Sequence, residues 1–353
     1  MSRTDSVAAE QQPLVSICIP VYNAEKTIAE TIRSILGQTY RNMEVLVFDN
    51  ASTDNTPAVL AEFSDPRLRI YRNDVNIGAE RNFGKAVQSA EGEDIALFHA
   101  DDVYLPEMVE KQVQAFQGNP AAGAVFTLAN FINSSGEIIG ESSLPPELRN
   151  RELYYFPEIF QAILENLNFL ICPSAMIRGK LYKELMPYNV EKFRSSADLD
   201  IWLRVLGTHP IVILQEKLMS YRFSVDQGSY QFAYLRTRRA DYFDVMDYYL
   251  SAGNITVSAL ALRKYELANN IDRIRCAKNY LLKNQPSEAK MLLKETFSAN
   301  MFWGFAGAGG GAGAHKVLAY WLFAAISLVL LNLGLGRSLT KILRGILLKG
   351  DAP

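Results

Sequence analysis

One short acidic cluster contains the residue types that bind divalent cations. It consists of His99, Ala100, Asp101 and Asp102. Carboxylate oxygens are preferred ligands of Mg²⁺ and Mn²⁺, and a neutral imidazole also binds metals. The same two aspartates would also suit the cap of a helix that begins near Pro106, so both interpretations stay open.

Three further polar clusters precede it in the chain. They are residues 20–23 (PVYN), residues 49–54 (DNASTD) and residues 76–82, where NIG is followed by Arg81 and Asn82. An Asp-rich turn such as 49–54 is by itself typical of a solvated turn or a helix cap. All four clusters, however, stand at the end of a predicted strand or at the start of a predicted helix.

The elements that must position these clusters are short strands alternating with helices. Apolar runs predict buried strands at Leu14–Pro20, Met43–Asp49 and Asp94–His99, and a weaker strand at Leu68–Tyr71. Helical spacing appears at Ala24–Leu36, Pro57–Phe63 and Gly78–Ala90. This alternation predicts an α/β fold with a mixed, mainly parallel sheet covered by helices on both faces. Because ligands bind outside the carboxyl ends of such strands, we expect the four clusters to share one edge.

The rest of the chain changes from mixed to helical. We predict strands at Ala124–Phe131, Ala175–Ile177, Ile211–Leu214 and Leu218–Phe223, and a helix at Ala197–Leu206. The pattern is helical from Tyr230 to about Phe297, with breaks near Gly253 and at Asn284–Pro286. The expected organisation is a loose tail (1–13), an α/β domain (14–229), a helical accessory region (230–300) and a Gly/Ala-rich segment with a hydrophobic helix and a basic tail (301–353).

Composition excludes several classes of protein. The net charge of −2 gives no general attraction to nucleic acid. The three cysteines, Cys18, Cys172 and Cys276, have no metal-type spacing and favour a reducing compartment. Residues 1–13 are polar and lack the apolar core of a secretory signal, so we expect substrates available in the cytoplasm.

Residues 14 to about 225 resemble family 2 glycosyltransferases, which have the Rossmann-like GT-A fold. The resemblance rests on three ordered runs, VSICIPVYNAEKTIAETIRSILGQTY, EVLVFDNASTDNT and NIGAERNFGKAVQSAEGEDIALFHADD. It implies transfer of a sugar from a nucleoside diphosphate sugar to an acceptor hydroxyl, with a bound Mg²⁺ or Mn²⁺. Uridine is the default nucleoside on family grounds.

The resemblance also implies roles for single residues. Asp101 is expected to coordinate the metal, and Asp102 to hold a metal-bound water or orient the loop. Asp49 is expected to contact the base or ribose, Tyr22 to stack beside the base, and Arg81 to face the diphosphate, unless it is an ordinary surface arginine. The expected donor-binding residues are Pro20, Tyr22, Asn23, Asp49, Asn76, Gly78, Arg81, His99, Ala100 and Asp102.

The segment from Ser195 to Arg204 resembles the part of the family that carries the catalytic base. Asp198 falls at that position, which implies an inverting reaction in which one carboxylate removes the acceptor proton. A structural role at a helix N-terminus is the alternative for Asp198. Two positions depart from the family pattern: His99 replaces an aspartate, and Ala197 replaces a glutamate.

The C-terminal segment suggests a membrane. Val317–Gly336 is uncharged and is followed by Arg337, Lys341, Arg344 and Lys349. It is long enough to cross a bilayer, but it would also serve as an in-plane helix or a buried helix, or pair with Phe302–Ala314 as a hairpin. We expect attachment to the cytoplasmic face of the membrane, or a cytoplasmic protein if the segment is buried.

Three rival functions are weighed against single-sugar transfer in polysaccharide or glycolipid synthesis. Processive synthesis is disfavoured because the Gln-x-x-Arg-Trp motif of processive synthases is absent: Gln227 is followed by Gly-Ser-Tyr. A nucleotidyltransferase would carry a Gly-rich phosphate loop where this chain has PVYN. A non-catalytic nucleotide-sugar-binding scaffold is conceivable because of His99 and Ala197, although Asp101 and Asp198 argue against it.

Overall fold

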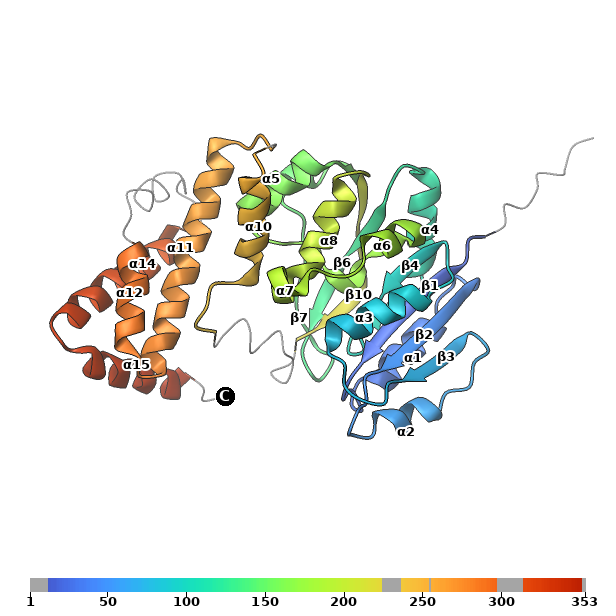
Figure 1. The fold of residues 1–353 in the computed structure, drawn as a ribbon, viewed down its shortest axis with the longest axis horizontal. Helices are drawn as coiled ribbons and strands as arrows, with labels where there is room; N and C mark the ends of the chain where they lie inside the picture. The colour runs from blue at the N-terminus through green and yellow to red at the C-terminus, as the bar shows by residue number, and fades with distance from the viewer. Residues whose placement is uncertain (1–11, 224–235, 254, 297–313, 351–353) are drawn as a thin grey trace, which may run out of the picture. The chain divides into compact units, whose positions relative to one another are not determined.

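The computed structural model describes residues 12–223, 236–253, 255–296 and 314–350 (Figure 1). The chain forms two compact units. The first contains Met1–Phe156, Phe169–Glu191 and Ala197–Phe223, and the second contains Pro157–Asn168, Lys192–Ser196 and Ser224–Pro353. The domain boundaries expected at 229 and 300 lie outside the described residues and stay predictions.

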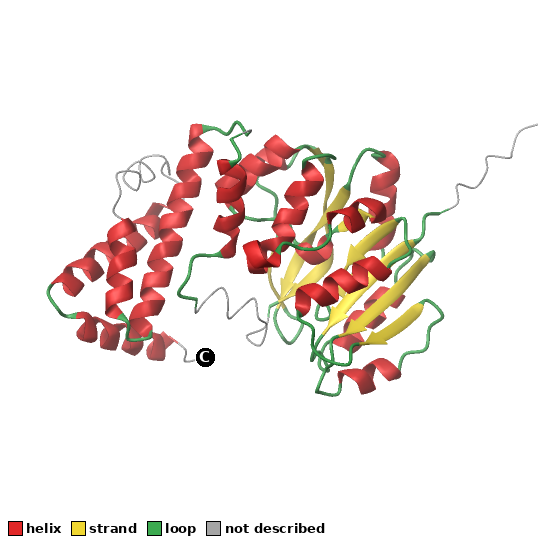
Figure 2. Ribbon diagram, in the orientation of Figure 1, coloured by secondary structure: helices red, strands yellow, loops and turns green. Residues whose placement is uncertain are grey.

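A ten-stranded sheet forms the centre of the first unit, with the order β3-β2-β1-β4-β9-β6-β10-β5 and with β7 and β8 paired to β6 and β10 (Figure 2). Six strands run parallel to one another: β1 (Val15–Val21), β2 (Met43–Asp49), β3 (Leu68–Arg72), β4 (Asp94–Leu97), β6 (Ala124–Ile132) and β10 (Ile211–Arg222). The others are β5 (Val103–Tyr104), β7 (Ile138–Glu141), β8 (Leu153–Tyr154) and β9 (Met176–Arg178). The predicted mixed, mainly parallel sheet is therefore confirmed.

Helices cover both faces of this sheet because successive strand residues point in opposite directions. On β1, Ile17 and Ile19 share an apolar core with α1 (Ile28–Leu36) and α4 (Met108–Gly118). Cys18 points to the other face, where its thiol donates to the backbone carbonyl of Ala86 in α3 (Ala79–Ser89). The unit also contains α2 (Thr56–Ala61), α6 (Gly179–Leu185) and α8 (Ala197–Leu206).

The predicted elements match the structure closely, with three instructive errors. The strand predicted to reach His99 ends at Leu97. The two strands predicted at Ile211–Leu214 and Leu218–Phe223 are one strand, β10, because a register shift between Leu214 and Lys217 lets polar residues pass without a turn.

The third error concerns the start of α1, which was predicted at Ala24 and lies at Ile28. The backbone N–H groups of Asn23, Ala24 and Glu25 donate to Ser52, Thr56 and Asp54, respectively. These bonds to the turn after β2 hold residues 23–25 out of the helix.

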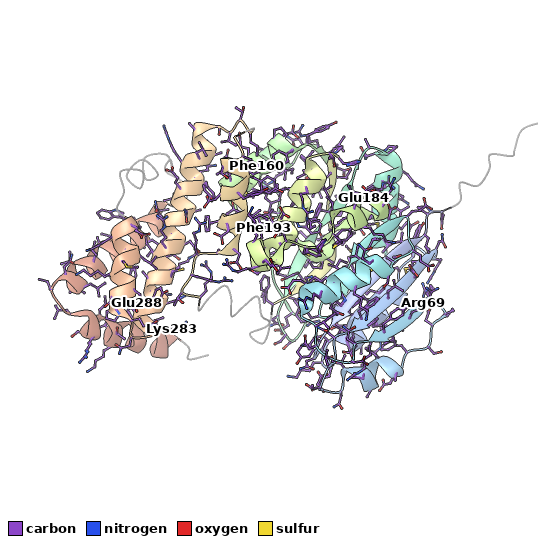
Figure 3. The ribbon with its side chains drawn as sticks, in the orientation of Figure 1. Arg69, Phe160, Glu184, Phe193, Lys283 and Glu288 are labelled. Atoms are coloured by element: carbon purple, nitrogen blue, oxygen red, sulfur yellow. The ribbon has the colours of Figure 1, made fainter. Side chains whose placement is uncertain are left out.

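The second unit is helical. It contains most of α5 (Phe156–Asn166), together with α10 (Asp241–Ser251), α11 (Ala259–Leu282), α12 (Pro286–Thr296), α14 (Ala314–Asn332) and α15 (Gly336–Gly350). Phe160 of α5 and Phe193, at the end of α7 (Val190–Phe193), are buried, and their rings contact Tyr249 and Tyr248 of α10 (Figure 3). A second core joins α11, α12, α14 and α15 through Leu281, Leu293, Leu331 and Leu339, among others.

The uncharged stretch Val317–Gly336 is not a single helix. Helix α14 ends at Asn332, Gly334 has a φ of 74°, and α15 begins at Gly336. Among residues 12–223, 236–253, 255–296 and 314–350, no helix combines the length and the apolar character needed to cross a membrane. The possible partner leg, Phe302–Ala314, falls almost entirely outside those ranges.

Candidate active site

The polar clusters found in the sequence lie at one edge of the sheet. Strands β1, β2, β3 and β4 are neighbours and parallel, so their carboxyl ends meet at that edge. Residues 20–23 follow or end β1, residues 49–54 follow β2, residues 76–78 follow β3, and residues 99–102 follow β4. The expectation of one shared edge is confirmed, and this edge is where ligands bind in open α/β sheets.

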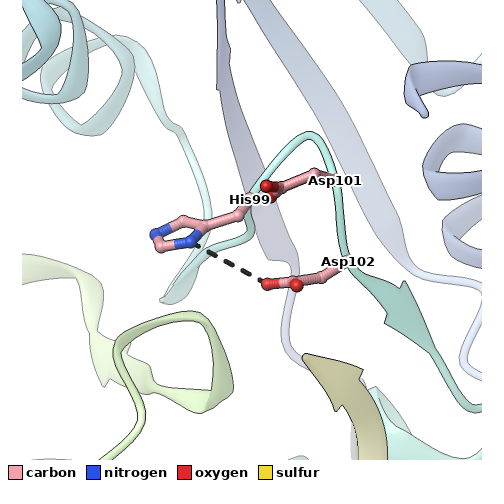
Figure 4. Close-up of side chains that lie close together, drawn as sticks. All are labelled: His99, Asp101 and Asp102. Atoms are coloured by element: carbon pink, nitrogen blue, oxygen red, sulfur yellow. Dashed lines mark ion pairs between the residues drawn. The ribbon is translucent and has the colours of Figure 1, made fainter. Parts of the chain in front are cut away.

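The turn after β4 brings together an imidazole and two carboxylates (Figure 4). One nitrogen of His99 and one oxygen each of Asp101 and Asp102 lie within 4.8 Å of one another. His99 Nδ1 is 3.8 Å from Asp102 Oδ2. Three possible ligand atoms are therefore close enough together to bind one divalent cation.

Helix α1 and β5 hold this turn from its backbone. The hydroxyls of Thr27 and Thr31 donate to the carbonyls of Ala100 and Asp102, at 3.0 and 2.7 Å. The backbone N–H of His99 donates to the hydroxyl of Tyr104 at 2.7 Å. The backbone of the turn is thus constrained before any ligand arrives, which favours a fixed ligand geometry.

Arg222, the last residue of β10, clamps the same turn from the other side. Its backbone N–H donates to Asp102 Oδ1, and its Nε donates to the carbonyl of Asp101, both at 2.8 Å. Its Nη2 pairs with Glu30 at 2.6 Å, and its Nη1 donates to the carbonyls of Asn133 and Ser134. Arg222 is 4% exposed, so its bonds to the turn are shielded from water.

The cluster fits a divalent cation. Asp102 Oδ2 is buried and has no hydrogen-bond partner within the part of the chain that the structure describes. Burial, and secondly the charge of Asp101, raise the pKa of Asp102 well above its ordinary value, as expected of a carboxylate without a compensating cation. Burial also lowers the pKa of His99, against the opposing charge of Asp101, and so favours the neutral imidazole that binds metals.

Asp49 is buried at the end of β2 and already has two partners. Its Oδ1 accepts from the backbone N–H of Ser52 at 3.0 Å, and its Oδ2 pairs with Arg72 at 2.5 Å. The carboxylate is 1% exposed and therefore shapes the turn after β2. Its expected contact with a base or ribose stays a prediction.

Asparagine side chains connect the ends of β2 and β3 with α3. Asn50 donates to Asn76 at 2.9 Å, and Asn73 donates to both Asn50 and Asn82. Asn82 in turn donates to the carbonyl of Phe48. The sequence pointed to Asn76, but it did not reveal that these amides form one network.

Asn76 and Gly78 together shape the start of α3. Asn76 Oδ1 accepts from the backbone N–H of Gly78 at 2.9 Å. Gly78 has a φ of 88°, a backbone conformation that residues other than glycine rarely adopt. These two residues thus shape the turn before α3, and their expected contact with the donor stays a prediction.

The remaining donor-site candidates differ in exposure. Pro20 is buried within β1 opposite Phe48, whereas Tyr22 is 48% exposed just beyond the strand. Asn23 has a φ of 51°, and its side chain accepts from the backbone N–H of Thr53 at 2.8 Å. Arg81 is exposed on α3. Tyr22 and Arg81 are therefore available to a ligand, and Pro20 and Asn23 position the loop.

Asp198 lies in the first turn of α8, where its carboxylate accepts from the backbone N–H of Leu199 at 2.8 Å. Burial raises the pKa of Asp198 to about 6, against the hydrogen bonds of that backbone N–H and of the Cys172 thiol. Burial, and then the charges of Asp198 and Asp102, raise the pKa of the Cys172 thiol well above its ordinary value. The sequence did not single out Cys172 for this position.

The neighbours of Asp198 on α8 are structural. Asp200 is buried and pairs with Arg204 at 3.0 Å, one helical turn away. Trp202 is fully buried with its ring edge-to-face against Phe126 and belongs to the core. Of the two carboxylates on α8, Asp198 alone lies beside Cys172.

Arg222 and Glu30 are not among the site residues predicted from the sequence. Arg222 is separated from Asp102 by 120 positions and from Glu30 by 192. No local pattern reveals such contacts, because the antiparallel pairing of β10 with β5 brings Arg222 beside this turn.

Comparisons with known proteins agree with this geometry. The model of glycosyl transferase family 2 matches residues 16–186. An uncharacterized glycosyltransferase of Methanocaldococcus jannaschii is 31% identical over 223 residues, which cover 61% of this chain and 73% of the relative. In Escherichia coli, WfgD is 30% identical over 217 residues, covering 61% of this chain and 79% of WfgD. By contrast, the match to a Rickettsia conorii glycosyltransferase spans only 37% of that relative.

The solved structure of Staphylococcus aureus TarS 1–349 with UDP-GlcNAc shares the fold, with a TM-score of 0.58 and 18% identity over 90% of both chains. The chain described here therefore belongs to glycosyltransferase family 2 and has the GT-A fold. It is an enzyme that transfers a sugar from a nucleotide sugar.

Proposed function

We propose that this enzyme is an inverting, metal-dependent glycosyltransferase that adds one sugar to an acceptor hydroxyl. The observation that carries the proposal is the His99, Asp101 and Asp102 cluster at the carboxyl edge of the sheet, together with the raised pKa of the buried Asp198 carboxyl. A cation site and a carboxylate of raised pKa are the two parts that such a reaction needs.

On the donor side, Asp101, with His99 and the free oxygen of Asp102, would hold Mg²⁺ or Mn²⁺. When bound, the cation neutralises the charge that develops on the leaving diphosphate. The mixture of imidazole and carboxylate favours Mn²⁺ over Mg²⁺, which prefers oxygen ligands. Arg81, exposed on α3, would face the diphosphate, and Tyr22 would stack beside the base.

On the acceptor side, Asp198 would accept the proton of the attacking hydroxyl. The acceptor oxygen forms a bond to the anomeric carbon as the bond from that carbon to the diphosphate oxygen breaks. The electron pair of the broken bond leaves with the nucleoside diphosphate, and the proton remains on Asp198. A single displacement of this kind inverts the anomeric configuration. The raised pKa makes Asp198 a stronger base than an ordinary aspartate.

We further propose a lipid-linked saccharide as the acceptor, at the cytoplasmic face of the membrane, in polysaccharide or glycolipid synthesis. The support is the name of WfgD, a UDP-Glc:α-D-GlcNAc-diphosphoundecaprenol β-1,3-glucosyltransferase. The nucleotide is proposed to be UDP, as in that name.

A donor screen tests the proposal. Purified protein is incubated with UDP-, GDP- and dTDP-sugars, with and without Mn²⁺ or Mg²⁺, and released nucleoside diphosphate is measured. Metal-dependent release from one donor, abolished in Asp101→Ala and Asp198→Ala, is expected once an acceptor extract is present. The matched control is Asp200→Asn, because the carboxylate of Asp200 pairs with Arg204 within α8. No release from any donor, even with membrane extract, would favour the scaffold function instead.

The anomeric configuration of the isolated product tests inversion separately. Retention of the donor configuration would exclude the single displacement by way of Asp198.

A further inference from the structure

Helix α14 exposes a row of large aliphatic side chains. The row consists of Leu318, Leu322, Ile326, Val329 and Leu333, with exposed fractions of 41, 44, 58, 57 and 68%. The spacing of three and four residues places the first four on one face of α14, and Leu333 directly follows the helix, with its backbone N–H bonded to the carbonyl of Val329. The row is about 22 Å long. We call these five residues the aliphatic stripe.

The stripe is distinct from the face by which α14 packs within its own unit. Ala324 and Leu331 are buried and join the core formed with α11, α12 and α15. A helix on the surface of a globular unit usually turns polar residues to solvent. Here the side facing away from the core is aliphatic along the length of the stripe, which indicates a partner.

Charge indicates the nature of that partner. Residues 296–350 contain no aspartate or glutamate, whereas they contain five basic residues: Lys316, Arg337, Lys341, Arg344 and Lys349. Arg337 and Lys341 are exposed on α15, which begins three residues after the end of the stripe. An aliphatic helix face flanked by cations is suited to an anionic lipid surface.

A shallow cavity beside α14 adds two further cations. It is lined by Ile274, Arg275, Lys278, Ala319, Tyr320 and Phe323, and has a volume of about 180 Å³. Arg275 and Lys278 are exposed on α11, and Arg275 Nε donates to the Tyr320 hydroxyl at 3.0 Å. The cavity thus combines an apolar floor with positive charge, as a lipid headgroup and the first part of its chain would require.

We propose that the aliphatic stripe lies in the interfacial plane of an anionic bilayer, with Arg275, Lys278, Arg337 and Lys341 near the headgroup phosphates. The inference rests on the proposed function, because it supplies a surface that brings the enzyme to a lipid-linked acceptor. A second copy of the chain fits the stripe less well, because it would oppose one acid-free basic segment to another.

Vesicle binding tests the proposal on the full chain. Wild-type protein is sedimented with phosphatidylcholine vesicles, with and without added phosphatidylglycerol. We expect binding to the anionic vesicles, weakened about tenfold or more in Leu322→Asp. The matched control is Leu260→Asp on α11, because Leu260 is 45% exposed and Leu322 is 44% exposed. The control is expected to bind within about twofold of wild type, and circular dichroism confirms the fold of each variant.

A charge variant tests the second half of the argument. Arg337→Gln combined with Lys341→Gln is expected to weaken binding to anionic vesicles several-fold and to reduce its dependence on salt. Binding that is equally strong on neutral vesicles would overturn the role of the cations.

Two results would overturn the proposed role of the aliphatic stripe in lipid binding. One is binding of Leu322→Asp at wild-type strength. The other is a wild-type dimer in light scattering that Leu322→Asp converts to a monomer, with no binding of either protein to vesicles.

Failure of this inference is distinguishable from failure of the proposed function. Hydrolysis of the donor, or transfer of its sugar to a soluble saccharide, is measured without vesicles as released nucleoside diphosphate. This release should be unchanged in Leu322→Asp. Loss of vesicle binding with donor turnover retained concerns the stripe alone. Vesicle binding without donor turnover in the wild type would instead refute the transferase proposal.

Discussion

At the acidic turn of the first unit, charged side chains are buried, whereas on α14 of the second unit aliphatic side chains are exposed. Asp102 is 0% exposed and Arg222 is 4% exposed, but Ile326 is 58% exposed. Each arrangement costs free energy unless something compensates it. Hydrogen bonds compensate part of the cost at the turn, and a cation would compensate the rest. On α14, the described residues of the second unit leave the side chains of the stripe exposed.

The comparison teaches that the two units place their functional groups by opposite rules. In the first unit, the proposed metal site lies where polar atoms are buried and incompletely paired. In the second unit, the proposed membrane surface lies where apolar atoms are exposed. Variants of the proposed functional residues should therefore differ from variants of neighbouring structural residues.

The largest effect is expected from the two carboxylates of α8. Asp198→Asn should lower kcat by about 10²–10⁴-fold with little change in Tm, because it removes the base but no ion pair. Asp200→Asn should instead destabilise the protein by about 1–3 kcal/mol, because it leaves Arg204 without its partner. Steady-state kinetics and thermal unfolding of both variants check this. Equal kinetic losses in the two would argue against Asp198 as the base.

Two leucines of the second unit should differ in stability. Leu281 is 0% exposed in the helical core, and Leu322 is 44% exposed in the stripe. Leu281→Ala should lower the free energy of unfolding by about 2–5 kcal/mol, because it leaves a cavity. Leu322→Ala should change it by less than about 0.5 kcal/mol. Urea unfolding of the full chain, followed by circular dichroism, measures both, and a large loss in Leu322→Ala would mean that the stripe is covered.

Arg222 should act as a positioning residue for the acidic turn. Arg222→Lys keeps the charge and the backbone N–H bonded to Asp102, but it loses the planar donors to Asp101, Asn133 and Ser134. We expect the Mn²⁺ concentration for half-maximal activity to rise about 10–100-fold.

The matched control for Arg222 is Arg69→Lys, because Arg69 pairs with Glu44 near the amino end of β3, away from the carboxyl edge of the sheet. It should leave the metal dependence unchanged. A rise in the Mn²⁺ requirement of that variant would point to a general loss of stability and not to a role of Arg222.

The pH profile should report Asp198. A base must be ionised to accept a proton, and burial raises the pKa of this carboxyl to about 6. Activity should therefore be retained above about pH 6 and fall by about tenfold for each pH unit below it. Measuring kcat/KM from pH 5 to 8 at saturating metal checks this. A decline of kcat/KM centred near the ordinary pKa of aspartate would show that burial does not raise the pKa of Asp198.

The smallest effect is expected from Cys172. Its thiol hydrogen bond lowers the pKa of Asp198 against the larger effect of burial. Cys172→Ala should therefore move the acid limb of the pH profile to higher pH, with a change of only a few-fold in kcat. Cys276→Ala, in the second unit, is the control and should leave the limb in place. An unchanged acid limb in Cys172→Ala would show that the thiol does not lower the pKa of Asp198.

Strands and helices with strong local sequence patterns were predictable from the sequence. Strand β2 and helix α8 have the predicted bounds, Met43–Asp49 and Ala197–Leu206, because buried parallel strands and amphipathic helices have strong local patterns. The shared sheet edge followed as well, because parallel strands must end on the same side. The identity of the acidic turn and the candidate base came from spacing and family resemblance.

Only the tertiary structure decided which groups meet. Strand β10 continues through a polar bulge, and this continuation carries Arg222 to the turn after β4. The pairing of Cys172 with Asp198 and the division of the 317–336 segment into two helices are further examples. Residue types and periodicity therefore determined the elements and the class of chemistry. Contacts between residues far apart in sequence depend on the register and packing of whole elements, which no local pattern encodes.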